Sequence, residues 1–237
     1  LRGLRERLEG ISPALERVED ARLRLWLLGM LHRYRLKGAL GHPYVAEAAR
    51  TFWGRSRYKR VDPRRELFPP AGRFKPRVMV TGRDRGHEHV LATTTGNQQP
   101  WHVRWARRAL GLGGIDETAL LDLVRAMLRE GEREGLLDKV HQDGPKEYFA
   151  ISPRAARIVA GGERLECART RRAIVRPAQE AAMWDGAPSL EYYAEYSAYR
   201  RTELTARQHY YRDRYRKGAL RRVVAEEHTG LLTTTER

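Results

Sequence analysis

Three arginines and two lysines have the types and spacing needed to contact phosphate groups. Arg125, Arg129 and Arg133 recur every four residues, which places their side chains on one side of a helix. Lys139 and Lys146 follow on two short runs rich in β-forming residues. A guanidinium donates in a planar fork that matches phosphate oxygens, so this set is a candidate for contacts to a nucleic-acid backbone. The alternative is a solvated basic face, neutralised by the glutamates of the same helix.

A second candidate lies near the end of the chain, where Arg221 and Arg222 precede the turn residues His228, Thr229 and Gly230. The apolar run that contains the two arginines predicts a buried strand. A Thr-x-x-Glu pattern after the turn has the form of a capping box and predicts the start of a helix. The alternative for His228 is an ordinary turn residue. Because the sequence stops at this pattern and does not begin with Met, we expect a fragment of a longer protein.

The residues needed for several other chemistries are missing from the sequence. It has no GxxxxGK[ST] loop and no strand-borne Asp-Glu pair for magnesium, so we predict no ATP hydrolysis and no catalytic residue in this chain. His87 and His89 would share one face of a strand, but a third ligand is missing, and we predict no metal site. Cys167 is the single cysteine, without a patterned histidine partner, and is expected to be inert.

Helical patterns dominate the first part of the chain. Ser12 and Pro13 predict a helix start, and apolar residues at helical spacing continue it to a glycine terminator at Gly38. A shorter helix is predicted at 43–53. The runs 78–81 and 90–94 predict a hairpin.

The clearest module follows. A helix at 101–110 is expected to end at Gly111, and a second helix to run from a cap at Asp116 to Gly135. The runs 136–141 and 146–151, joined by a turn, predict a two-stranded ribbon. A helix followed by such a ribbon is the closing half of a winged helix. One more short helix is predicted from 152.

The string RRVVAEEHTGLL at 221–232, preceded by YYRDRYRKGAL, resembles the start of the second RecA-like domain in DEAD/DEAH-box superfamily 2 helicases of the MrfA/YprA type, relatives of the Lhr helicases. In that family a strand leads into a His-Thr-Gly or His-Gly turn, and a helix opening with Glu-Arg follows. Here those positions are Val223-Val224, 228–230 and Glu236-Arg237. The WDGAP string at 184–188 and the winged-helix-like block resemble the same family's middle region.

The resemblance implies that DNA is the substrate and that the whole enzyme requires ATP and magnesium, whose motifs would lie upstream. It also implies that the loop after the terminal strand lies near the phosphates of the bound strand. Some members carry cysteine pairs between the winged helix and the second RecA-like domain. Here the string from Cys167 to Thr170 keeps one cysteine, and the string from Gly186 to Ser189 has a serine where such a pair would offer another.

These patterns predict an α+β, mostly helical fold with a winged-helix-like module and flanking helices, and the resemblance implies that the first strand of a RecA-like α/β domain follows. The predicted divisions are a helical region with a small hairpin at 1–95, the winged-helix-like module at 96–160, a basic Tyr- and Arg-rich helical connector at 161–219, and the truncated start of the second RecA-like domain at 220–237. The aromatic residues interleaved with arginines, such as Trp101, Trp105 and Tyr199, are expected to pack in the core rather than to stack on bases.

Charge and composition limit the kinds of partner that this protein is expected to have. A net charge of +16 and a pI near 10.5 favour a polyanionic partner. The lone cysteine and the lack of a long apolar run predict a cytoplasmic protein with no membrane partner. Taken with the charge, the resemblance implies a nucleic-acid-binding segment of an ATP-dependent DNA helicase, whose partners are single-stranded or duplex DNA and the remaining RecA-like domains. A stand-alone winged-helix DNA-binding protein without enzymatic activity is the alternative, and an RNA-binding basic protein fits the charge alone.

Overall fold

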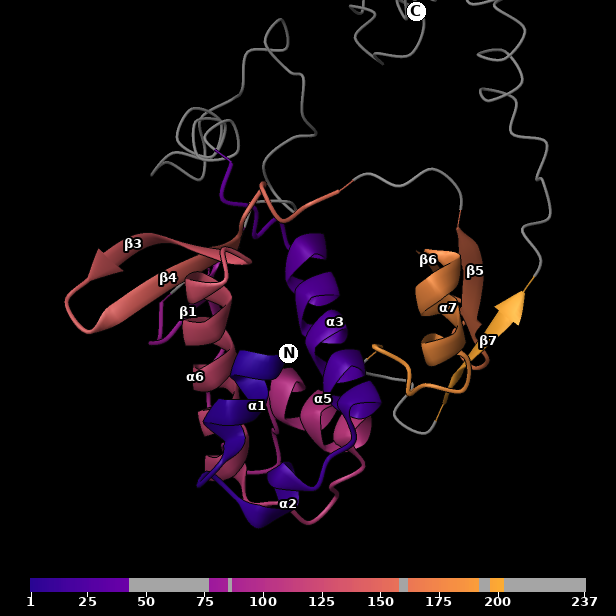
Figure 1. The fold of residues 1–237 in the computed structure, drawn as a ribbon, viewed down its shortest axis with the longest axis horizontal. Coiled ribbons are helices and arrows are strands. Elements are labelled where there is room, and N and C mark those ends of the chain that lie inside the picture. The colour runs from indigo at the N-terminus through magenta and orange to yellow at the C-terminus, as the bar shows by residue number, and fades with distance from the viewer. Residues whose placement is uncertain (43–76, 85–86, 158–161, 192–196, 203–237) are drawn as a thin grey trace, which may run out of the picture. The chain divides into compact units, whose positions relative to one another are not determined.

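The computed structural model describes residues 1–42, 77–84, 87–157, 162–191 and 197–202, and these belong to the α+β class, with two small sheets (Figure 1). The helices are α1 (Arg2–Leu8), α2 (Pro13–Glu16), α3 (Asp20–Leu36), α5 (Trp101–Leu110), α6 (Glu117–Arg133) and α7 (Ala178–Trp184). The strands are β1 (Met79–Val80), β2 (Glu88–His89), β3 (Leu137–Asp143), β4 (Lys146–Ile151), β5 (Glu163–Cys167), β6 (Ala173–Arg176) and β7 (Tyr199–Thr202). The predicted helix at 43–53 and every prediction beyond residue 202 lie outside the described residues.

The first predicted helix begins and ends where expected but is interrupted. Ser12 Oγ accepts a hydrogen bond from Ala14 N at 3.3 Å, and Gly38 has a φ of 79° after the last turn. The prediction of one continuous helix was wrong, because α2 ends and α3 begins on either side of Val18. Arg5, from α1, donates to the Val18 carbonyl oxygen at 2.6 Å. This contact satisfies a carbonyl that would otherwise need a partner one helical turn later.

Helices α3 and α5 approach closely at Gly29. A Cβ atom on Gly29 would lie 2.2 Å from Trp105 Cζ2, so only glycine leaves room for the indole. Trp105 is fully buried and its Nε1 donates to the carbonyl oxygen of Trp26 at 2.9 Å. The Trp105 ring stacks on Trp101 at 5.9 Å and on Trp184 of α7 at 6.2 Å between centroids. These indoles link α3, α5 and α7.

The first sheet has the strand order β2-β1-β4-β3. The hairpin predicted from the runs 78–81 and 90–94 was wrong, because β1 and β2 pair in parallel, Met79 with Glu88. The antiparallel partner of β1 is β4, with Met79 opposite Phe149. Strand β4, which is distant in sequence, pairs with one edge of β1. Strand β2 therefore pairs with the other edge of β1. Both Met79 and Val80 are fully buried.

The predicted helix and ribbon at 117–151 are confirmed as α6, β3 and β4. Gly135 has a φ of 68° and ends α6, and Leu136 N then donates to the Gly131 carbonyl oxygen at 2.7 Å. Asp116 occupies the N-cap position, but its side chain makes no capping hydrogen bond. The ribbon turns at Gly144, which has a φ of 55°, and its register shifts between Lys139 and His141.

The short helix predicted from residue 152 is replaced by a turn, in which Ala155 N donates to the Ser152 carbonyl oxygen at 3.1 Å.

The second sheet, with the order β6-β5-β7, was not predicted. The described part of 161–219, which was predicted to be a helical connector, contains the short helix α7 and the three strands of this sheet. Along β5, Leu165 and Cys167 are buried while Arg164 and Glu166 are partly exposed. This alternation is the signature of a strand with one buried face, and α7 packs against β5.

The expected core placement of the aromatic residues is confirmed for Trp101, Trp105 and Tyr199, which are all buried. The core around them is contiguous and includes residues of α3, α5, α6 and α7. Within the described ranges, every helix is too short or too polar to cross a membrane.

Candidate nucleic-acid interface

The outward face of α6 presents two of the predicted arginines. Arg125 and Arg129 are both exposed, and the opposite face of the helix, with Leu120, Val124 and Met127, is buried. Arg125 Nη1 donates to Asp122 Oδ1 at 2.5 Å, an i,i+3 pair. Arg129 has no ion pair within the described residues, which leaves its full charge available to a ligand.

Arg133, the third arginine of the row, has a structural role. Its guanidinium pairs with Glu130 at 2.6 Å and with Glu134 at 3.2 Å. The Glu130 side chain is only 5% exposed and also pairs with Arg7 of α1. The Arg7–Glu130 pair therefore links α1 to α6, whereas the Arg133–Glu130 pair lies within α6.

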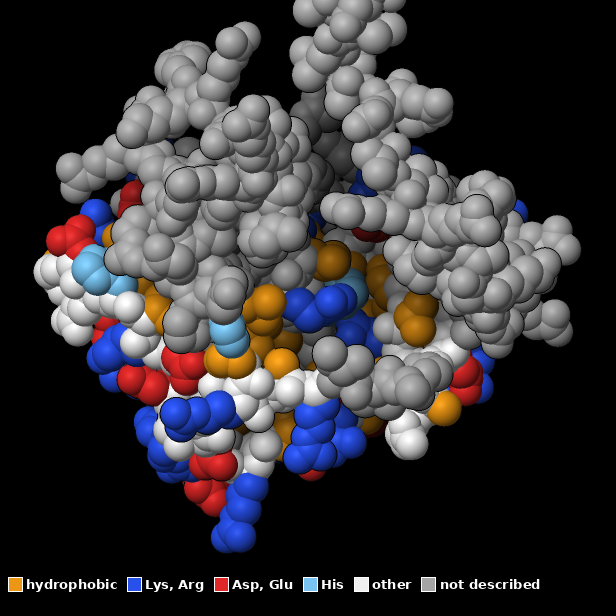
Figure 2. Space-filling model, turned by 90° about the horizontal axis from the view of Figure 1, so that it is seen from above, with side chains coloured by type: hydrophobic (Ala, Val, Ile, Leu, Met, Phe, Trp, Pro, Cys, Tyr) orange, Lys and Arg blue, Asp and Glu red, His pale blue; other side chains and the backbone are white. Residues whose placement is uncertain are grey.

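The β3–β4 ribbon projects beyond α6 (Figure 1) and carries the predicted lysines. Lys139 Nζ lies 3.4 Å from Glu147 Oε1 and 4.0 Å from Glu132 Oε1. Lys146 Nζ lies 3.9 Å from Asp143 Oδ2. Exposed pairs of this kind are weak, about 0–1 kcal/mol, so a phosphate can displace the carboxylates. Figure 2 shows the same mixing of basic and acidic side chains over the described surface that it displays.

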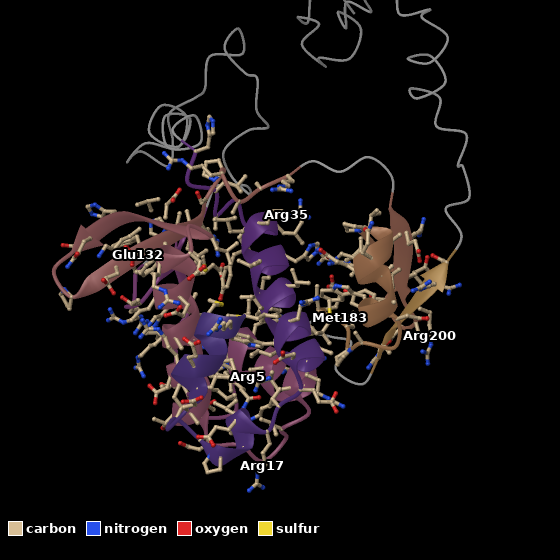
Figure 3. All side chains as sticks on the ribbon, in the orientation of Figure 1. Arg5, Arg17, Arg35, Glu132, Met183 and Arg200 are labelled. Atoms are coloured by element: carbon tan, nitrogen blue, oxygen red, sulfur yellow. The ribbon has the colours of Figure 1, made fainter. Side chains whose placement is uncertain are left out.

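A hollow of about 250 Å³ separates α6 from the ribbon. Arg125 and Arg129 line it on the helix side, and Glu147 and Phe149 line it on the strand side. Glu132, labelled in Figure 3, also lines it. The fold therefore brings the two helix arginines together beside the ribbon, while the lysines are tied to the neighbouring acids.

The other predicted binding residues, Arg221, Arg222, His228, Thr229 and Gly230, lie outside the described residues. The structure places none of them.

One of the two histidines considered as metal ligands, His87, packs against an aromatic ring. His87 meets the Tyr148 ring edge-on at 5.5 Å between centroids. Tyr148 donates to Asp84 Oδ2 at 2.8 Å, and this hydrogen bond, with burial, raises the pKa of the tyrosine to about 12. In the described part of the chain, no three His, Cys, Asp or Glu residues gather as a metal site would require.

Cys167 is fully buried among hydroxyl groups. Its Sγ lies 3.4 Å from Ser197 Oγ and accepts from Thr170 N at 3.5 Å. Burial raises the pKa of the thiol, but hydrogen bonds from Ser189, Ser197 and Thr170 together outweigh it and lower the pKa to about 6. Ser189, which was compared with a family cysteine, thus lies near Cys167, as does Thr170.

A further basic cluster escaped prediction. Arg35 Nη2 of α3 lies 3.4 Å from His32 Nδ1 of the same helix, and burial, followed by the charges of Arg176 of β6 and of Arg35, lowers the pKa of His32 to about 3. Sequence spacing carries no signal for this cluster, because its members lie on elements distant in the chain and meet only when the second sheet packs on α3.

No family model, curated protein or solved structure matches this chain.

Proposed function

We propose that this chain is a nucleic-acid-binding, inter-domain segment of an ATP-dependent superfamily 2 DNA helicase, with a winged-helix-like module at 96–160. One observation carries the binding part of the proposal. Helix α6 is followed directly by a projecting two-stranded ribbon, and Arg125 and Arg129 line the hollow between them. Basic side chains on a helix beside a wing are placed to contact phosphates on either side of a groove.

The helicase part of the proposal is supported by the terminal string at 221–232 and by the surroundings of Cys167. The resemblance compared Ser189 with a family cysteine, and Thr170 ends the string in which Cys167 is kept. Both hydrogen-bond to Cys167 in the structure. Residues that replace the ligands of a lost metal site are expected to remain close together and to substitute hydrogen bonds for metal bonds.

ATP and magnesium enter this proposal only through the parent enzyme. The chain has no phosphate-binding loop, so its own residues bind and orient nucleic acid and no step of hydrolysis is assigned to them. Its net charge of +16 is sufficient to hold several phosphates, and binding would release the counterions condensed on them.

The binding experiment measures the affinity of the chain for single-stranded and duplex DNA as a function of salt. We expect a steep linear fall of log K with log salt, and the variant Arg129→Gln should lower the slope by about 0.7 on single strands and about 0.9 on duplex. Arg17→Gln is the matched control, because Arg17 is exposed at the end of α2 and its removal changes the net charge equally. A flat salt dependence in the unaltered chain would remove the nucleic-acid function.

The helicase assignment has a separate test in the flanking genomic sequence. An in-frame phosphate-binding loop and Asp-Glu box upstream would support it. A start codon at Leu1 with a stop codon after Arg237 would instead favour the stand-alone winged-helix protein.

A further inference from the structure

The hollow between α6 and the β3–β4 ribbon has an apolar floor. Leu128 of α6 and Phe149 of β4 both line it, and each of these side chains is only 2% exposed. Leu91 also lines the hollow and packs against the core. Because the wall residues Arg125 and Arg129 are exposed, a ligand can enter the hollow from solvent.

The walls of the hollow carry charges of both signs. Glu132, in the last turn of α6 (Figure 3), and Glu147 of β4 oppose the charges of the two arginines. The position of Glu147 is fixed by its backbone N, which donates to Thr81 Oγ1 at 2.9 Å. Since the charges of Arg125, Arg129 and the two glutamates cancel, the interior does not select an isolated phosphate. It suits a neutral group that has both hydrogen-bond donors and acceptors.

The size of the hollow limits this group to a single ring system. The volume is about 250 Å³. At about 30 Å³ per water molecule, it has room for about eight waters, which is close to the number of non-hydrogen atoms in one pyrimidine base. One base of a nucleic acid therefore fits, whereas a base pair does not.

We propose that this hollow binds one unstacked base of single-stranded DNA and prefers cytosine to thymine. The inference rests on the proposed function and deepens it, because it adds a base contact to the phosphate contacts of Arg125 and Arg129. A guanidinium has several donors, so each arginine can contact a phosphate outside the hollow and a base within it.

The preference for cytosine follows from the hydrogen-bonding groups of the two pyrimidines. A carboxylate accepts from the N4 amino group of cytosine, and a guanidinium donates to its N3 or O2 atom. Thymine has a carbonyl oxygen in place of that amino group, so this oxygen and a carboxylate would meet as two acceptors. In a duplex the same edge of the base is already paired, so only an unstacked base can present it.

The experiment compares the affinities of the whole 237-residue chain for oligo(dC) and oligo(dT) of equal length. The two strands carry the same number of phosphates, so binding through phosphates alone would give nearly equal affinities. We expect oligo(dC) to bind about 5- to 100-fold more tightly at the same salt concentration. A slightly alkaline buffer keeps oligo(dC) single-stranded.

Glutamine variants locate the preference. Glu132→Gln and Glu147→Gln keep the shape of the side chain but replace an acceptor by an amide that also donates. At least one of them should bring the ratio of the two affinities close to one. The ratio is the readout, because loss of a negative charge strengthens binding to both strands. Glu134→Gln is the matched control, since Glu134 is exposed at the end of α6 and does not line the hollow.

The outcomes distinguish this inference from the proposed function. Salt-dependent binding with equal affinities for the two strands, or with oligo(dT) bound more tightly, would overturn the base site and leave the proposed function standing. A preference for oligo(dC) that persists in both Glu132→Gln and Glu147→Gln would also overturn the site, because the preference would then arise elsewhere. The absence of binding to either strand would overturn both proposals.

Discussion

The close contact between Gly29 and Trp105 leads us to predict how much the variant Gly29→Ala is destabilised. In the variant Gly29→Ala, the new methyl carbon would lie 2.2, 2.4 and 2.6 Å from three indole atoms of Trp105. Ordinary carbon contacts are about 3.5–4.0 Å. The indole has little freedom to retreat, because it is hydrogen-bonded to the Trp26 carbonyl and stacked between two nearly parallel rings.

Two opposing contributions decide the size of the effect. Alanine is favoured over glycine inside a helix by about 1 kcal/mol. Displacing a fully buried tryptophan loses packing comparable to a large-to-small core substitution, about 3–5 kcal/mol. The net expectation is that Gly29→Ala lowers the free energy of unfolding by about 2–4 kcal/mol.

Urea unfolding followed by far-ultraviolet circular dichroism measures this loss as a lower midpoint at an unchanged m-value. The control is the same substitution in a Trp105→Phe background, where the clashing indole atoms are absent. Gly29→Ala should then cost much less, giving a coupling energy in the double-mutant cycle. A Gly29→Ala chain as stable as the unaltered one, or about 1 kcal/mol more stable, would refute the close approach of α3 and α5.

Three further predictions concern buried polar groups. Burial lowers the pKa of His102 to about 4 from 6.5, so the unfolded chain binds the proton first and stability falls as pH decreases from about 6.5 toward 4. His102→Gln keeps a donor for the Ala92 carbonyl and should flatten that dependence by up to about 1.4 kcal/mol per pH unit, measured by urea unfolding across this range; an unaltered pH profile would contradict it. Glu130→Gln should lower the free energy of unfolding by about 1–3 kcal/mol, because it weakens charged hydrogen bonds at a buried acceptor; the exposed Glu134→Gln should change it by less than about 1 kcal/mol, and equal effects of the two variants would argue against the buried pair. Cys167 should resist iodoacetamide in the folded chain and react after unfolding in urea, because its sulfur is fully buried; rapid labelling of the folded chain, read by mass spectrometry, would show that the thiol is accessible.

Short sequence patterns predicted the helix ends and the turn, whose conformation depends on the residues next to them in sequence. The glycines after α5 and α6 adopt the left-handed conformation expected of helix terminators, and the ribbon turns at Gly144. The interruption at Val18 has no such signal, since it depends on Arg5 reaching back from another helix. The pairing of β1 with β4 also depends on a contact between residues far apart in sequence, and short runs cannot reveal which partner a strand will choose.

The second sheet escaped prediction for a related reason. Its strands are short, and the Arg- and Glu-rich sequence hides the alternation of Leu165 and Cys167 among charged neighbours. The candidate site shows the same limit. The positions of Arg125 and Arg129 on one helix face followed from their spacing, but the pairing of Lys139 with Glu147 and the convergence of Arg176 on α3 required the fold.

The stacked indoles give a spectroscopic signal that depends on the packing of α7, which lies on the second sheet, against α5. Trp105 and Trp184 lie within 9° of parallel, and Tyr199 meets Trp184 at 73°, so their ultraviolet transitions are held in a fixed asymmetric arrangement. Near-ultraviolet circular dichroism senses such tertiary order, whereas the far-ultraviolet signal reports secondary structure. Detachment of α7 from α5 would separate Trp105 from Trp184 and so weaken the near-ultraviolet signal while leaving the far-ultraviolet signal unchanged. Spectra recorded with and without DNA can follow that docking with no added dye.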